Sequence, residues 1–112
     1  MTSEERRIIV AGESGIAVRS SNDVSDALGV CLGSDGLMLN ESDLSPEFFE
    51  LRTGLAGELF QKFTNYNVRV AIVLSDFDAH GERFSELARE HSRHPLIRFF
   101  ESSDRAEDWL RN

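Results

Sequence analysis

The stretch Val68–Leu74 constrains the fold more than any other part of this chain. It is a nearly continuous run of apolar residues, most of them β-branched, with Arg69 as its one charged side chain. A strand of this kind is covered on both faces, which is typical of parallel sheets. Parallel neighbours are joined by crossover connections that usually contain a helix, so strands and helices should alternate along the chain. We therefore expect an α/β domain built around this strand.

The segments on either side follow that alternation. Short β-rich runs at Ile8–Ala11 and Ile16–Val18, separated by a Gly-Glu-Ser-Gly turn sequence, predict an N-terminal hairpin. Further strands are predicted at Leu37–Leu39 and Leu96–Phe100, and helices at 21–32, 45–63, 82–92 and 102–110, with a bend or restart near Gly54. The 112 residues fit one domain, 1–112. The expected fold is a single α/β domain with a mostly parallel five-stranded sheet, an N-terminal hairpin and four helices.

Charge and composition limit the classes of partner that the chain is expected to bind. The chain has 20 acidic residues against 12 Lys and Arg, a net charge of −8, and no basic run long enough to follow a phosphate backbone, so we expect no nucleic-acid binding. No apolar run approaches the ~18 residues of a membrane span, and the first ten residues show no signal-peptide core. The single cysteine, Cys31, excludes an internal disulfide and lies on an apolar helical stripe, which predicts a buried thiol. We expect the chain to work in the cytoplasm, without contact to a membrane.

Acidic and imidazole side chains follow two of the predicted parallel strands. Ligands of open α/β sheets usually bind at the carboxyl ends of the strands. A divalent metal could be held there by carboxylates, with the histidine as a general base. The spacing matches no defined metal loop, and strand-end loops are often acidic without binding anything. The candidate ligand or metal residues are Glu41, Asp43, Asp76, Asp78 and His80.

A protein-binding surface is the competing interpretation. The helical region from Phe48 to Phe63 carries more large apolar side chains than one buried stripe needs, and an aromatic residue also occurs in the polar loop after Leu74. A wide core stripe would explain most of these residues, but a homodimer or partner contact would use the others. The candidate interface residues are Phe48, Phe49, Phe60 and Phe77.

Thr53 is a candidate phosphoacceptor. It precedes Gly54, where the long helix is expected to restart, and a phosphate there would be attracted by the helix amides. The alternative is that Thr53 only caps the helix locally. Signatures of other chemistry are missing, because Gly12-Glu13-Ser14-Gly15 is too short for a nucleophile elbow and precedes a strand rather than a helix. We expect no cofactor.

The stretch from Ser45 to Phe63, followed by Val68–Val73 and Asp76-Phe77, resembles a bacterial family known as domain of unknown function 4180. The resemblance spans nearly the whole chain, but the family implies no activity. The order of elements is also similar to the STAS domains of anti-sigma-factor antagonists, which implies a STAS-like fold. In those domains a Ser or Thr before Gly-Leu accepts a phosphate, and Thr53-Gly54-Leu55 falls at the comparable place, with Arg52 where an aspartate is common.

We therefore expect a small bacterial module that regulates or binds, rather than an enzyme, with a protein partner or a second copy as its ligand. The alternative is a small metal-dependent enzyme or ligand-binding protein that uses the acidic residues at the strand ends.

Overall fold

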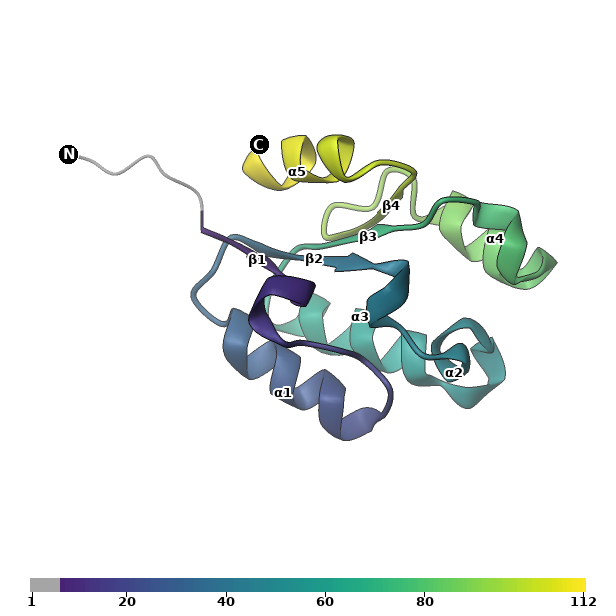
Figure 1. The fold of residues 1–112 in the computed structure, drawn as a ribbon, viewed down its shortest axis with the longest axis horizontal. Helices are drawn as coiled ribbons and strands as arrows, with labels where there is room; N and C mark the ends of the chain where they lie inside the picture. The colour runs from purple at the N-terminus through teal and green to yellow at the C-terminus, as the bar shows by residue number, and fades with distance from the viewer. Residues whose placement is uncertain (1–6) are drawn as a thin grey trace.

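Four parallel strands form the central sheet of this computed structural model, which describes residues 7–112 (Figure 1). The strands are β1 (Ile8–Val10), β2 (Gly36–Asn40), β3 (Val70–Val73) and β4 (Ile97–Phe100), and their spatial order is β1-β2-β3-β4. The strand predicted from the apolar run is β3, which lies between β2 and β4. Its residues Val70, Ala71 and Ile72 are completely buried, so the prediction of a strand covered on both faces is confirmed.

Helices cover both faces of this sheet. They are α1 (Ser21–Cys31), the short α2 (Pro46–Phe49), α3 (Leu55–Asn65), α4 (Glu82–Glu90) and α5 (Ser103–Arg111). Because the strand order follows the chain order, right-handed crossovers place the connecting helices on one side of the sheet. Figure 1 shows α1 and α3 on one face and α5 on the other. None of the helices described between residues 7 and 112 is long and apolar enough to cross a bilayer.

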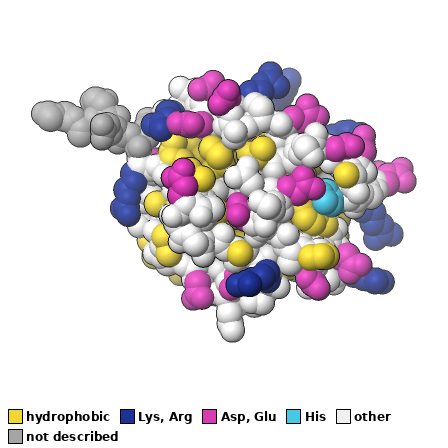
Figure 2. Space-filling view, in the orientation of Figure 1, with side chains coloured by type: hydrophobic (Ala, Val, Ile, Leu, Met, Phe, Trp, Pro, Cys, Tyr) yellow, Lys and Arg dark blue, Asp and Glu magenta, His cyan; other side chains and the backbone are white. Residues whose placement is uncertain are grey.

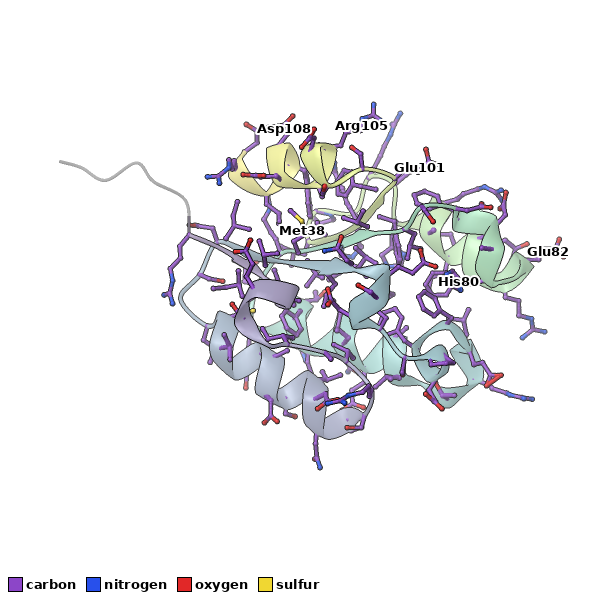
Figure 3. The ribbon with its side chains drawn as sticks, in the orientation of Figure 1. Met38, His80, Glu82, Glu101, Arg105 and Asp108 are labelled. Carbon is purple, nitrogen blue, oxygen red and sulfur yellow. The ribbon has the colours of Figure 1, made fainter. Side chains whose placement is uncertain are left out.

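Each face has its own core. The larger one packs the inner faces of α1, α3 and α4 against the sheet, and its biggest fully buried side chains are Phe48, Phe63 and Phe84. The smaller one lies under α5, where Met38 and Ala71 of the sheet meet Ala106 and Leu110 (Figure 3). Cys31 is fully buried in the larger core, as its position on the apolar stripe predicted. Burial raises the pKa of its thiol to about 11, and the nearby charge of Arg7 offsets this only in part.

The predicted break near Gly54 is confirmed. The chain leaves α2, makes a single 3-10 turn at Leu51–Thr53 and then enters α3 through Gly54, whose φ of 80° lies in the left-handed region. Glycine reaches this conformation without a steric penalty, so it can join two helices at an angle. The region predicted as one helix with a bend or restart is therefore two helices, which brings the number of α-helices to five in the described residues instead of four.

The predicted N-terminal hairpin is wrong. Residues Ala11–Ser14 form a 3-10 turn that ends at Gly15, and the amide of Ile16 closes it by donating to the Ala11 carbonyl at 2.9 Å. Val18 does not return to β1. Its amide donates to the Asp43 carbonyl at 2.8 Å, which makes an isolated parallel bridge to the loop after β2. The sheet of residues 7–112 therefore has four parallel strands, not five, and no antiparallel pair.

Candidate functional site

The loops that follow β2 and β3 lie side by side at the carboxyl edge of the sheet. Asn40, the last residue of β2, is in register with Val73, the last residue of β3. A 3-10 turn over Glu41–Asp43 follows β2, and a second one over Phe77–His80 follows β3. The first residue of one turn and the last residue of the other thus come from neighbouring strand ends, although they are 39 positions apart in the chain.

Glu41 and His80 form the central contact of this site. Nε2 of His80 lies 2.8 Å from Oε2 of Glu41. The other oxygen, Oε1, accepts longer hydrogen bonds from the hydroxyl of Ser75 at 3.3 Å and from its amide at 3.4 Å. Partial burial raises the pKa of Glu41, but the hydrogen bonds from His80 and Ser75, together with the charge that His80 carries when it is protonated, hold this pKa below its ordinary value. The carboxylate is therefore kept ionised.

Phe49 holds the His80 ring from one side. The two rings are stacked, with centroids 3.6 Å apart and planes at 7°. Phe84 meets both of them edge-on, at 5.1 Å from Phe49 and 6.0 Å from His80. The His80 side chain is 19% exposed, and its Nδ1 has no hydrogen-bond partner within the described part of the chain. Its orientation is fixed by packing on one side and by Glu41 on the other.

A hollow of about 420 Å³ opens beside this cluster. It is lined by apolar side chains and two carboxylates: Glu41, Leu44, Pro46, Phe49, Glu50 and His80. Figure 2 shows a histidine at the surface that touches an acidic side chain and is bordered by hydrophobic ones, and Figure 3 labels His80 at that place. The hollow combines an apolar wall with negative charge, which suits a ligand that has an apolar body and a cationic head.

The remaining acidic candidates are engaged within their own loops or, for Asp78, by the helix that follows. Asp43 accepts a hydrogen bond from the Asn40 amide at 2.8 Å and so closes the turn after β2. Asp76 accepts from the Asp78 amide at 2.9 Å, and Asp78 accepts from the Ser85 hydroxyl at 2.6 Å. Of the five predicted ligand residues, the structure thus brings only Glu41 and His80 together. Residues 7–112 contain no group of three or more His, Cys, Asp or Glu that could hold a metal ion.

The aromatic candidates lie in three different environments. Phe48 is fully buried in the larger core, rather than at the surface. Phe60 and Phe77 are partly buried and pack edge-on against the Phe99 ring, at 6.0 and 6.4 Å. Phe49 is the one that lines the hollow, so a predicted interface residue and two predicted ligand residues occupy the same site.

Thr53 lies at the junction between α2 and α3. Its hydroxyl is within hydrogen-bond distance of the carbonyls of Glu47, at 2.7 Å, and Glu50, at 2.8 Å, and it accepts from the Leu55 amide at 3.3 Å. The hydroxyl therefore ties the end of α2 to the start of α3. Phosphorylation of Thr53 stays a prediction, and a phosphate would have to replace these local bonds.

Three residues of the hollow were missed from the sequence: Leu44, Pro46 and Glu50. Pro46 is the first residue of α2. The available signal is the short distance along the chain, since α2 begins six residues after β2 ends at Asn40. The sequence alone did not show that this helix would turn back towards His80.

The fold and the hollow define a small parallel α/β domain with a candidate binding site at its strand ends. The chain belongs to the family described as "Domain of unknown function (DUF4180)", whose model matches residues 3–110. No curated protein and no solved structure matched the chain. The STAS-like fold therefore stays a prediction, and the hairpin in the order of elements on which it rested is absent from the described residues.

Proposed function

We propose that this domain is a non-catalytic regulatory module that binds a basic, partly apolar segment of a partner protein in the hollow beside Glu41 and His80. The observation that carries the proposal is the ionised Glu41 carboxylate, fixed by His80 beside an apolar wall. A second carboxylate, Glu50, lies on the same hollow. The net charge of −8 favours the approach of a cationic partner.

Arginine and lysine side chains have the chemistry that this hollow fits. Each combines an apolar stem with a cationic head, so the stem can pack on Phe49 and Leu44 while the head reaches a carboxylate. Hydrogen bonds between such a head and a carboxylate are charge-assisted and therefore stronger than neutral ones. The volume of about 420 Å³ is enough for one long side chain and part of its neighbour.

The test is an NMR titration of the full chain with a blocked Leu-Arg-Leu tripeptide, up to about 10 mM. The matched control peptide contains citrulline, which has the shape of arginine without its charge. We expect amide shifts at Phe49 and His80 with the arginine peptide and much smaller shifts with citrulline. Glu41→Gln should lower the affinity for the arginine peptide by about fivefold. Glu86→Gln, on the exposed side of α4, should leave that affinity unchanged. Equal binding of both peptides, or of neither, would contradict the proposal.

A second copy of the chain is one possible source of the basic segment. Light scattering over a concentration series, with and without EDTA, decides this point. A stable dimer that is insensitive to EDTA and is lost in Glu41→Gln would identify the second copy as the partner. A monomer at all concentrations would assign the segment to another protein.

The metal-dependent alternative is favoured by one observation, the placement of His80 and Glu41 at 2.8 Å from each other. Imidazole nitrogen and carboxylate oxygen are both metal ligands, but two of them need further ligands from water or substrate. Calorimetry with magnesium, calcium and manganese at near-millimolar concentrations tests it directly. Heat that disappears in both Glu41→Gln and His80→Gln would favour the metal site over the peptide site.

A further inference from the structure

A second hollow lies at the opposite edge of the molecule from β1. It is a groove of about 640 Å³ along the outer edge of β4, between α4 and α5, which flank this strand (Figure 1). Three arginines and several aromatic rings line it, from both helices and from the strand itself. The residues that the argument uses are Arg89 of α4, Arg98, Phe99 and Phe100 of β4, and Arg105 and Trp109 of α5.

The backbone of β4 is open on this side at Phe99, whereas the amide of Ile97 already donates to Nδ1 of His94 at 3.0 Å. β4 pairs with β3 alone, so it is an edge strand. The carbonyls of Leu96 and Phe100 accept hydrogen bonds from Val70 and Leu74, at 2.7 and 2.9 Å, and therefore point towards β3. Because backbone groups alternate in direction along a strand, the N–H and C=O of Phe99 point the opposite way, into the groove. Such a pair can accept one more strand.

The groove is also basic, in a protein with a large negative net charge. Arg105, which Figure 3 labels on α5, has no hydrogen bond or ion pair from its guanidinium within the described residues. The guanidinium of Arg98 lies 5.1 Å from the Trp109 ring centroid and donates to the His94 carbonyl at 2.7 Å, but meets no carboxylate there. Arg89 has a long contact of 3.4 Å to Asp78.

The titration of His94 agrees with this excess of positive charge. Burial lowers the pKa of His94 below its ordinary value, and the charges of His91 and Arg98 lower it further. Local carboxylates would have the opposite effect. One acid, Asp108, does line the groove, yet it forms no ion pair with the arginines within residues 7–112.

We propose that the groove along β4 binds an extended, carboxylate-rich peptide segment of a partner protein, which adds as a strand to the open edge at Phe99 while its acidic side chains meet Arg89, Arg98 and Arg105. Main-chain hydrogen bonds supply the register, and the arginines select acidic sequences. This surface and the partner chemistry it requires are independent of the acidic hollow at the other site.

A second copy of the chain fits this edge poorly. An antiparallel pairing of two β4 strands around Phe99 would place Arg98 of each copy opposite Phe100 of the other and diagonal to the other Arg98, where two long side chains of like charge come within reach of each other and disfavour the pairing. The three arginines of each copy would then face one another across the contact. An acidic partner removes this repulsion, so the charge pattern selects a different chain.

Trp109, the single tryptophan of the chain, lines the groove and reports on its occupation. The probe is a blocked peptide of about eight residues that alternates glutamate and valine, titrated into the full chain and followed by tryptophan fluorescence and amide NMR. Comparison ligands are the same peptide with glutamine for glutamate, the same peptide N-methylated at alternate residues, citrate, and an oligothymidine of about eight nucleotides. The protein variants are Arg105→Gln and, as a control of equal charge change away from the groove, Arg83→Gln.

We expect the glutamate peptide to change the Trp109 emission and to slow amide exchange at Phe99. The glutamine and N-methylated peptides should bind much more weakly than the glutamate peptide. Arg105→Gln should lower the affinity for the glutamate peptide by about three- to fivefold, and Arg83→Gln should leave this affinity unchanged. Four results would overturn the proposal: no binding, equal binding of the N-methylated peptide, a citrate response of the same size, or tighter binding of oligothymidine. Circular dichroism shows whether Arg105→Gln is folded. If it is not, the comparison of the glutamate peptide with its N-methylated form on the wild-type protein still decides the outcome.

Discussion

Gly36 is the position where a single methyl group should harm the fold most clearly. This residue begins β2 and is buried under α5. A Cβ added there would lie 2.6 Å from Cδ2 of Leu110, 3.2 Å from the carbonyl oxygen of Arg69 and 3.4 Å from its Cβ. The Leu110 side chain is completely buried, so it has little room to move away. The Arg69 carbonyl accepts from the Leu37 amide at 2.9 Å, so displacing it would strain the pairing of β2 with β3.

Gly36→Ala should therefore lower the free energy of unfolding by about 2 kcal/mol, the middle of the range for overpacked cores. For a chain of 112 residues this corresponds to a decrease in Tm of roughly 8 °C. Gly57→Ala is the matched control, because Gly57 lies inside α3 and a Cβ there would meet no heavy atom within 4 Å. Alanine is the better helix former, so the free energy of unfolding of this variant should be higher than that of the wild type by about 0.5–1 kcal/mol.

Urea unfolding followed by circular dichroism and by Trp109 fluorescence measures both variants. Since Trp109 is on α5 next to Leu110, its emission should also shift in native Gly36→Ala, if the helix has been pushed away from the sheet. A Gly36→Ala protein as stable as the wild type would show that α5 is not held as close to β2 as described. Equal losses in both variants would remove the contrast between contact and open space on which the reasoning depends.

Three further predictions concern single side chains. The pKa of Glu41 is lowered in the folded state, so its stabilising contribution is present above the ordinary value of 4.5 and is lost as the pH falls through the folded-state pKa. In Glu41→Gln the urea midpoint should accordingly fall less steeply at acidic pH than in the wild type. The same acid dependence in both proteins would refute this. Thr53→Val removes the hydroxyl that joins α2 to α3 and should cost about 1 kcal/mol in urea unfolding, with no loss if those bonds are unimportant. Cys31, whose pKa is raised to about 11, should react with a disulfide reagent only as fast as the protein opens, and rapid labelling of the native protein would contradict its burial.

The elements that could be predicted are those set by residues close together in the chain. The apolar run that became β3 is visible in composition alone, and the glycine break before α3 depends on the backbone of a single residue. The incorrectly predicted hairpin shows the limit of prediction from local sequence. Its sequence fits a turn between strands, but the deciding bond is the one from Val18 to Asp43, which are 25 positions apart and carry no local signal of their contact.

The candidate site was predicted in part for the same reason. Glu41 and His80 were placed at the ends of parallel strands, and neighbouring strand ends do meet. Which acids would face the hollow was not predicted, although short aspartates such as Asp43 and Asp76 commonly bond to their own backbone, as they do here. The groove beside β4 could not be predicted, because it depends on β4 being an edge strand. The order of strands in a sheet is not indicated by any local sequence pattern.

Because α5 follows the four strands described between residues 7 and 112, one face of the sheet stays uncovered through most of synthesis. Met38 and Ala71 are buried by Ala106 and Leu110 of that helix within the described residues, and β2 and β3 leave the ribosome well before it does. Until α5 docks, a nascent chain with the other face already packed would present an apolar strip to chaperones and to other chains. Premature termination before Ser103 should thus yield a product whose fate is clearance or aggregation, even though every strand is present.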